Sequence, residues 1–323
     1  MAQDKQDVKK IHYELGAALD EKRKIRILTE VFERRVGYPL DLENPRTMNE
    51  KIVWLKLFYQ DPLITRCADK FAVKDYVREV VGEEYVVPLL AAWSDPDEID
   101  FDALPDRFVL KVNWSRGYNI IVRDKSKLDV EKTREKLRSW IQPGRSAYYQ
   151  YFNWGFRHMK PVICAEQYLA RTAAQRCEYK FFFSHERFLH LLIETDRWGE
   201  KEATGTFFDE RLQKIPCTYG GKPNADPALP KHLDKMLELA GKLAKPFPYA
   251  RADFYEIGDA IYLNEMTFYP GGGLRPFDPP EWDRILGDQI PLPEKRIIDR
   301  EDFAFRVRSL LKRVQLKLSG KLP

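Results

Sequence analysis

Two short segments in the C-terminal third carry side chains that suit phosphoryl chemistry. Arg251 and Asp253 are two residues apart in one predicted strand, as are Glu265 and Thr267 in the next. Because side chains alternate between the faces of a strand, each pair shares one face, and a hairpin turning at Gly258-Asp259 brings the pairs together. Two carboxylates and a hydroxyl suit Mg²⁺, and an adjacent arginine can stabilise a phosphoryl group in transfer. The alternative is a cross-strand ion pair on a solvated face.

The composition is that of a folded protein with nearly balanced charge. The 323 residues are 44% hydrophobic, and 54 Lys and Arg against 50 Asp and Glu give a net charge of +4. This excludes a largely disordered chain and is too weak to indicate a nucleic-acid partner. No apolar run approaches about 18 residues, the first residues are polar, and the cysteines form no CxxC pair. We therefore expect a cytoplasmic protein without a structural zinc ion or a disulfide framework.

Helices and antiparallel strand pairs must position the reactive residues. The first 84 residues show helical patterns, with helices expected at 18–36, 51–58 and 67–81. From residue 85 strand pairs dominate, which favours an α+β fold over alternating βαβ units. We divide the chain into a helical N-terminal region (1–84), a first lobe (85–165), a second lobe (166–293) and a C-terminal helix (294–323). The expected strands are 86–90, 107–112, 119–123, 161–166, 179–183, 188–194, 249–257 and 260–266, with further helices at 129–140 and 230–244.

Longer stretches of the sequence resemble one protein family. Arg-x-Asp on one strand and Glu-x-Thr on the next, followed by Pro270-Gly271, resemble the catalytic hairpin of ATP-grasp enzymes. The chain as a whole is similar to the TupA-like (teichuronopeptide biosynthesis-like) branch of that family, in collinear order over residues 40–293. The resemblance implies an ATP-grasp fold, in which two α+β lobes clasp ATP, here preceded by a helical region. The segments that carry it are 44–56 (NPRTMNEKIVWLK), 68–74 (ADKFAVK), 82–85 (GEEY), 104–111 (LPDRFVLK), 124–129 (DKSKLD), 165–169 (AEQYL), 178–180 (EYK) and 279–287 (PPEWDRILG).

The resemblance assigns a phosphate-binding loop to the first lobe. Lys111, near the end of the strand 107–112, stands where the family places a nucleotide-phosphate lysine. Asn113, Arg116 and Gly117 belong to the following turn, whose backbone N–H groups can cradle phosphates. The family form is close to Asn-His-Gly-Ser-Gly, whereas this chain has Asn-Trp-Ser-Arg-Gly. Either Arg116 supplies charge in place of the N–H groups, or the loop is impaired, or the segment is an ordinary hairpin turn.

The start of the second lobe would contact the rest of the nucleotide. The resemblance places Glu166, Tyr168 and Leu169 at the hinge that holds adenine, with Glu166 as a polar contact. It makes Lys180 a second phosphate lysine, and the alternative is a surface ion pair between Lys180 and Glu178. It also implies ATP and Mg²⁺ as cofactors. The implied metal ligands are Asp253, Glu265 and Thr267, and the implied catalytic residues are Arg251 and Lys180.

Substrate recognition departs further from the family. Asp196 and Arg197 match an Asp-Arg pair of the family and are candidate substrate residues. Arg275, after three glycines, is a third candidate, for a carboxylate or a phosphate, with a solvated loop position as the alternative. The His-x-Arg stretch that the family shows next is absent, because this chain has Ala-Thr-Gly-Thr at 203–206. The identity of the acceptor is therefore the least determined part of the prediction.

The last thirty residues form a basic, amphipathic pattern. Apolar residues at 303, 307, 310, 311, 314 and 318 repeat with helical spacing among Lys and Arg. Such a helix suits an anionic membrane surface or a docking site, and the alternative is a terminal helix packed on the body. A peripheral contact with the inner face of a membrane is compatible with this pattern.

The function that the resemblance implies is an ATP-dependent carboxylate–amine ligase. ATP phosphorylates a substrate carboxylate, and an amine then displaces phosphate to form an amide. The partners are a small-molecule or glycan carboxylate and an amine, in the biosynthesis of a surface polysaccharide such as a capsule, an O-antigen or a teichuronopeptide-like polymer. Two alternatives are a glycosyltransferase of such a pathway and a non-catalytic ATP-grasp scaffold. No convincing nucleotide-sugar DxD motif supports the former, and the altered loop at 114–116 favours the latter.

Overall fold

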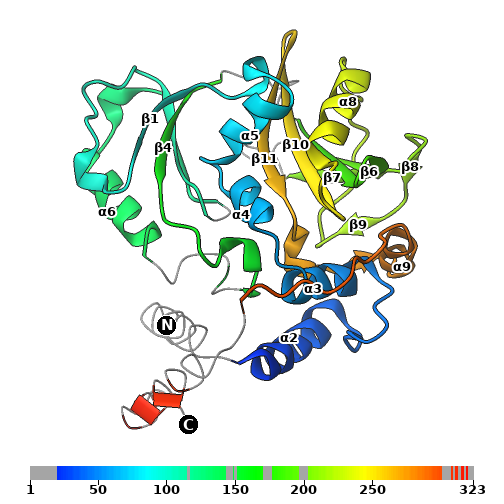
Figure 1. Ribbon diagram of the computed structural model, residues 1–323. Helices are drawn as coiled ribbons and strands as arrows, with labels where there is room; N and C mark the ends of the chain where they lie inside the picture. The colour runs from blue at the N-terminus through cyan, green and yellow to red at the C-terminus, as the bar shows by residue number, and fades with distance from the viewer. Residues whose placement is uncertain are drawn as a thin grey trace.

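Two antiparallel sheets lie on either side of a pair of short helices, α4 and α5 (Figure 1). The computed structural model describes residues 20–114, 117–142, 148, 151–169, 177–195 and 203–299, and in the tail residues 307, 310, 311, 314, 315 and 318. Within these residues the α+β class predicted from the sequence is confirmed, because helices pack around antiparallel strands and no strand of either sheet is paired in parallel with another. No described helix is long and apolar enough to cross a membrane.

The smaller sheet has four strands in the order β1-β4-β2-β3. Its β2 (Phe108–Val112) and β3 (Asn119–Val122) form the predicted hairpin. β1 (Leu89–Trp93) pairs with β4 (Ile163–Gln167) and begins later than predicted, because the chain first forms the 3₁₀ helix η1 (Glu83–Tyr85). α6 (Val130–Trp140) follows β3 and begins at Asp129, whose side chain accepts a hydrogen bond from the backbone N–H of Lys132.

The larger sheet has six strands in the order β11-β10-β5-β6-β7-β8. At one edge β10 (Ala250–Ile257) and β11 (Ala260–Thr267) form the predicted hairpin, which turns at Gly258 with a φ of +62°. β5 (Glu178–Ser184) and β6 (Arg187–Thr195) form the second predicted pair. β7 (Thr204–Phe208) and β8 (Lys214–Ile215) extend the sheet and were not predicted. The helix α8 (Leu233–Ala244) packs on β10 and β5, and a separate ribbon pairs β9 (Thr218–Tyr219) with β12 (Phe277–Asp278).

The N-terminal helices begin and end at residues that the sequence indicates. α2 (Glu21–Val36) ends at Gly37, which has a φ of +96°. α3 (Met48–Phe58) begins with a reciprocal cap, in which Thr47 and Glu50 each bond the other's backbone N–H. The helix predicted at 67–81 is wrong as one element, because it is divided at Asp69 into α4 (Pro62–Ala68) and α5 (Val73–Val80). The remaining elements are α9 (Glu281–Asp288) and the 3₁₀ helices η2 (Pro96–Glu98), η3 (Lys125–Lys127), η5 (Trp154–Phe156) and η7 (Pro270–Gly273).

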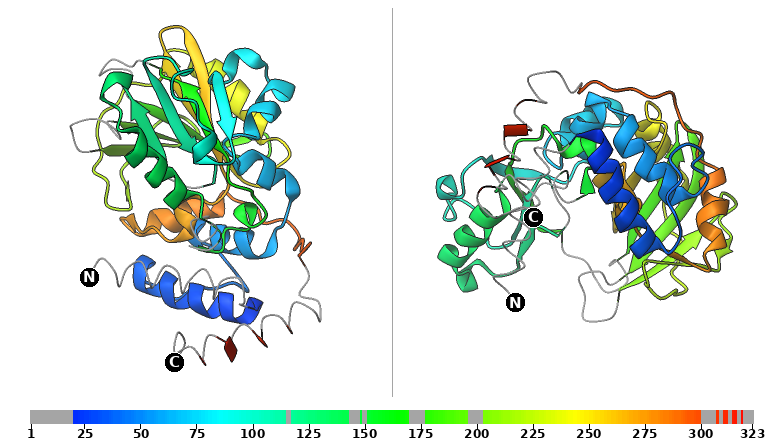
Figure 2. Two further views of the ribbon diagram at one scale, coloured as in Figure 1. Left: turned by 90° about the vertical axis from the view of Figure 1, so that its left-hand side faces the viewer. Right: turned by 90° about the horizontal axis from the view of Figure 1, so that it is seen from below.

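The N-terminal helices are fastened to the C-terminal part of the body (Figure 2). The backbone N–H of Asn49 donates to Asp283 Oδ1 over 2.9 Å, and its side chain donates to Asp283 Oδ2 over 2.6 Å. Lys51 Nζ, also on α3, donates to the carbonyls of Gly287 and Ile290 at the end of α9. The buried Lys56 Nζ donates to Gly272 O over 2.7 Å. α3 thus holds both α9 and the glycine turn that follows β11.

Candidate active site

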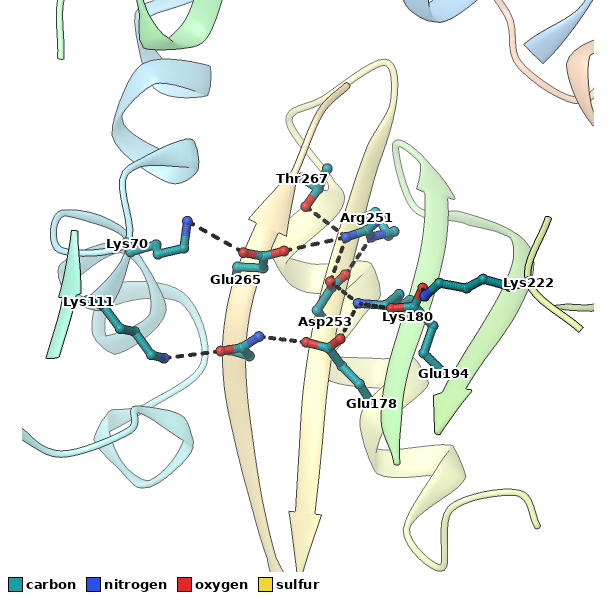
Figure 3. Close-up of polar contacts among 11 residues, drawn as sticks. Lys70, Lys111, Glu178, Lys180, Glu194, Lys222, Arg251, Asp253, Glu265 and Thr267 are labelled. Carbon is teal, nitrogen blue, oxygen red and sulfur yellow. Dashed lines mark hydrogen bonds and ion pairs between the residues drawn. The ribbon is translucent and has the colours of Figure 1, made fainter. Parts of the chain in front are cut away.

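The β10–β11 hairpin brings the four predicted residues together in register. Asp253 pairs with Glu265 across the two strands, and Arg251 pairs with Thr267. Arg251 donates two hydrogen bonds of 2.6 Å to Asp253 and a third, of 3.0 Å, to Thr267 Oγ1. Its guanidinium also lies 3.6 Å from Glu265 Oε1 (Figure 3). The hairpin therefore concentrates one cation and two carboxylates at the edge of the larger sheet that faces α4.

Polar residues on β5 and β6 extend this group. Together with the hairpin residues and the side chains that contact them, we call them the polar strip. Lys180 lies beside Asp253 in the register of β5 with β10, and its Nζ donates to Asp253 Oδ2 over 2.7 Å and to Glu178 Oε2 over 2.5 Å. Glu194 on β6 is 3.4 Å from the same Nζ and is also paired with Lys222. Lys180 is only 1% exposed, so its ammonium group is directed into a cluster of carboxylates. The predicted surface pair of Lys180 with Glu178 exists, but it is buried.

Lysines from elements outside the larger sheet reach the same group of polar residues. Lys111 on β2 donates to Asn264 Oδ1 on β11 over 3.3 Å and contacts Glu166 Oε2 over 2.5 Å. Lys70, between α4 and α5, lies 3.6 Å from Glu265 Oε2 (Figure 3). Lys74 on α5 contacts the second oxygen of Glu166 over 2.8 Å. Lys111 and Lys70 thus reach the hairpin from elements outside the larger sheet, and Lys74 is linked to Lys111 through Glu166.

Burial and charge act in opposite directions on the carboxylates of the site. Burial raises the pKa of Asp253 above its usual value, although Arg251 and Lys180 favour its ionised form. Burial also opposes ionisation of Glu166, but Lys111 and Lys74 outweigh it and lower the pKa of that carboxyl. Glu194 is buried too, and Lys180 and Lys222 hold its pKa at about 2. Glu166 and Glu194 are therefore ionised at neutral pH. Each depends on its neighbouring lysines to remain ionised.

The donor set of the hairpin fits Mg²⁺. Asp253, Glu265 and Thr267 offer only oxygen atoms, which is the chemistry that this ion prefers. The Glu265 side chain is 22% exposed, whereas that of Asp253 is fully buried and has both oxygens engaged by Arg251 and Lys180. In the described part of the chain no three His, Cys, Asp or Glu residues gather as a metal cage. Mg²⁺ is commonly held by one or two carboxylates, with water and phosphate completing its shell.

The other predicted residues lie in less uniform surroundings. The buried side chain of Asn113 bonds Asp69, the carbonyl of Lys160 and the N–H of Val162, so it fastens the loop to neighbouring segments. Next to it, Trp114 is 3% exposed and donates from Nε1 to the carbonyl of Trp140. Gly117 has a φ of +81°, in the left-handed region that favours glycine. Arg116, Asp196 and Arg197 lie outside the described residues.

Tyr168, Leu169 and Arg275 are partly exposed. Tyr168 and Leu169 follow directly after β4, which ends beside Glu166. The guanidinium of Arg107 lies 5.8 Å from the ring of Tyr168. Arg275 follows the glycine turn, and its guanidinium lies 5.7 Å from the ring of Tyr219. Neither arginine–aromatic contact was predicted from the sequence, and Arg275 is placed away from the polar contacts of the hairpin.

Sequence reasoning missed five residues of the polar strip. Lys70 and Lys74 lie in the segment 68–74, whose similarity to the family was noted without a role for either lysine. Asn264 precedes Glu265 and bridges Lys111 and Glu178 through its amide. The alternation that placed Glu178 and Lys180 on one face of β5 also applies to Glu194 on β6, but only the strand pairing shows that they meet. Lys222 lies in a loop, and no sequence pattern indicates its approach.

The match to a family model comes from most of the chain. A model described as TupA-like ATPgrasp matches residues 50–291. The chain belongs to the TupA-like ATP-grasp family. The range includes β10, β11 and every lysine discussed above, so the site lies inside the matched part of this TupA-like protein. The resemblance predicted from the sequence and its ATP-grasp fold are confirmed. A search of curated proteins gave no match.

Several solved structures of ligases are similar to the TupA-like protein at low identity. A D-alanine–D-alanine ligase from Bacillus anthracis complexed with ATP is 14% identical, with a TM-score of 0.41 over 77% of this chain and 68% of that chain. The corresponding ligase from Helicobacter pylori is 19% identical, with a TM-score of 0.40 over 70% and 61%. An L-amino acid ligase from Bacillus licheniformis is 13% identical, with a TM-score of 0.39 over 66% and 44%. This chain spans less than two thirds of the latter two proteins, and we take no activity or substrate from any of them.

Proposed function

We propose that this TupA-like protein is an ATP-dependent, Mg²⁺-requiring ligase that joins a carboxylate to an amine. The observation that carries the proposal is the convergence of three cationic side chains on the polar residues of one hairpin. Lys70 and Lys111 approach from the α4–β2 side, and Arg251 lies on the hairpin itself. A nucleoside triphosphate carries several negative charges along its phosphate chain, so its binding requires such converging cations.

The proposed reaction has two steps. A carboxylate oxygen of the acceptor attacks the terminal phosphorus of ATP, and the bond to the bridging oxygen breaks, which releases ADP and leaves an acylphosphate. The amine nitrogen then attacks the acyl carbon, and phosphate leaves as the amide forms. Arg251 and Lys111 stabilise the charge on the phosphoryl oxygens, and rigid placement on two strands orients the groups. Mg²⁺ bound at Glu265, Asp253 and Thr267 would neutralise further phosphate charge.

The buried lysine has a supporting part in this proposal. Lys180 is enclosed by Glu178, Glu194 and Asp253 and is almost fully buried. Its ammonium group balances the charge of carboxylates that would otherwise repel one another on adjacent strands. We therefore propose that Lys180 keeps Asp253 ionised and in place, in addition to the phosphate contact that the family resemblance implies.

For the acceptor we propose a uronic-acid carboxylate of a surface polysaccharide and, for the amine, an amino acid. The support is the family itself, whose name refers to teichuronopeptide biosynthesis. A cytoplasmic location, where ATP is available, agrees with this reaction. Arg275 is partly exposed and lies over the ring of Tyr219, and a guanidinium in this place suits a carboxylate-bearing acceptor.

The test is a product assay with the full chain. The protein is incubated with ATP, Mg²⁺, a uronic-acid glycan and a pool of amino acids, and ADP, phosphate and product mass are measured. We expect ADP and phosphate in equal amounts, only with the acceptor present, and a product heavier than the glycan by the amine minus water. A glycan that gains a hexose from a UDP-sugar without ADP formation would instead establish a glycosyltransferase. Stabilisation of the protein by ATP with Mg²⁺ in a thermal-shift assay, without any turnover, would favour a non-catalytic scaffold.

A further inference from the structure

The C-terminal tail presents a row of apolar side chains to water. Val307, Leu310, Leu311, Val314 and Leu318 are helical and are 37%, 55%, 63%, 47% and 85% exposed. Their spacing of three, one, three and four residues keeps them on one side of a helix. In Figure 1 the described pieces of the tail, in red, lie below the two sheets. An apolar stripe of this length in water requires a partner.

The charge of the chain is divided unevenly between its last 21 residues and the rest. Residues 303–323 contain six Lys and Arg and no Asp or Glu. The first 302 residues hold the other 48 Lys and Arg and all 50 Asp and Glu, so their net charge is −2. The whole positive excess of the protein therefore lies in its last 21 residues. A cationic segment of this kind is attracted to anionic surfaces, and a net charge of only −2 on the rest of the chain competes weakly with a dense anionic surface.

The positions of the basic residues distinguish a lipid surface from a docking groove. On a helical projection Arg308 and Lys312 fall on one side of the apolar stripe, and Arg306, Arg313 and Lys317 fall on the other. Basic residues that flank an apolar stripe on both sides can reach lipid headgroups while the stripe enters the acyl boundary. From these observations we propose that the tail from Phe303 to Leu318 binds in the plane of an anionic lipid surface.

The tail leaves the body at a fixed point, so its binding would also place the body. The backbone N–H groups of Ile298 and Asp299 donate to Gln60 Oε1 over 2.7 and 2.8 Å. Asp299 accepts a hydrogen bond from Trp154 Nε1 over 2.6 Å and pairs with Arg157. These contacts anchor the start of the tail to α3 and η5. The tail thereby holds the body at the lipid surface, whether or not the proposed ligase activity is correct.

The experiment is vesicle co-sedimentation of the full-length protein. Vesicles of phosphatidylcholine alone are compared with vesicles containing about one third phosphatidylglycerol, at low and high salt. We expect binding to the anionic vesicles to be at least tenfold stronger at low salt and to weaken strongly in high salt, because mobile ions screen the attraction. The double variant Leu310→Glu/Leu311→Glu should bind the anionic vesicles at least tenfold less.

Control measurements distinguish lipid binding from other interactions that could cover the apolar stripe. Ile285→Glu changes an apolar residue of α9 that is 45% exposed, and it should leave vesicle binding unchanged. The melting temperature of each variant checks that the body remains folded. Equal binding of the wild type to neutral and anionic vesicles, or unchanged binding of the Leu310→Glu/Leu311→Glu variant, would overturn the proposal. A wild-type dimer that this variant dissociates, without lipid binding by either, would assign the stripe to a second copy of the chain and also overturn it.

Discussion

Lys111 Nζ on the smaller sheet donates a hydrogen bond over 3.3 Å to Asn264 Oδ1 on the larger sheet. Asn264 donates in turn to Glu178 Oε1 over 2.7 Å, so polar contacts run from β2 through β11 to β5. Glu166 holds the same lysine from its own sheet over 2.5 Å. A triphosphate that enters between the sheets would take the place of the Asn264 contact while Glu166 keeps the lysine oriented.

We expect Lys111→Met to weaken ATP binding by roughly 10–100-fold, because a charge-assisted hydrogen bond to a phosphate is lost. Isothermal titration with ATP and Mg²⁺ measures the dissociation constant. Lys127→Met, a change at a lysine whose side chain is 81% exposed, serves as the control. Unchanged affinity in Lys111→Met would remove this lysine from the nucleotide site.

Glu265→Gln should abolish turnover with little change in melting temperature. The amide is similar in size to the carboxylate but binds Mg²⁺ poorly, and the side chain is partly exposed. ADP release is measured over a range of Mg²⁺ concentrations. Glu281→Gln on the exposed side of α9 is the matched control and should behave as the wild type. Full activity in Glu265→Gln would mean that this carboxylate is structural.

Arg251→Met should affect both the reaction and the fold. Loss of the guanidinium leaves the buried Asp253 with Lys180 as its remaining cationic contact, which we expect to cost about 3–5 kcal/mol in the free energy of unfolding. Turnover should fall by about 10²–10⁵-fold, by comparison with lost arginine fingers and oxyanion donors. Urea unfolding gives the first quantity and ADP release gives the second, each against Arg284→Met on the surface of α9. A stable variant with normal turnover contradicts the assignment of Arg251.

His190 should make the stability of the protein depend on pH in the acid range. Burial lowers its pKa from 6.5 to about 3, and its ring stacks on Phe182 with a centroid distance of 4.2 Å. Between these values the unfolded chain binds a proton that the folded protein does not, so the free energy of unfolding falls as pH drops from 6.5 to 3. The slope approaches about 1.4 kcal/mol per pH unit for a single group.

His190→Phe should remove that contribution, because phenylalanine fills a similar space and does not titrate. Urea unfolding at intervals from pH 7 to pH 4 should show the wild type losing stability faster than the variant. Both proteins contain Glu194, whose lowered pKa also makes the folded state less stable in acid. Its contribution is the same in both and cancels in the comparison. Parallel pH profiles for the two proteins would show that His190 is not protonated on unfolding in this range.

The parts of the site that the sequence predicted are those that local alternation controls. Arg251 and Asp253, and Glu265 and Thr267, share a face because a strand repeats every two residues, and Gly258 supplies the turn that sets the register. These relations depend on neighbours along the chain, so the residue types suffice to predict them. Lys111 was placed by its match to the family instead, near the end of a predicted strand.

The missed parts depend on tertiary contacts. Asp69 divides the predicted helix because its carboxylate accepts bonds from Phe71 N and Ala72 N, and it also holds Asn113 from another sheet. That break directs Lys70 toward β11 and Lys74 toward β4. β7 was not predicted, because residues 203–206 were considered only for the family stretch that they lack, and its pairing with β6 is a tertiary contact.

The bond between Asn49 and Asp283 joins residues 234 positions apart. At about 5–20 residues per second, a ribosome needs roughly 10–50 seconds to deliver α9 after α3 has been made. During that interval α3, which is buried on almost every side in the folded protein, has no partner for its apolar residues. We expect a chaperone or the ribosome surface to shield it. The helices that are synthesised first would then be the last to take their final place in the body.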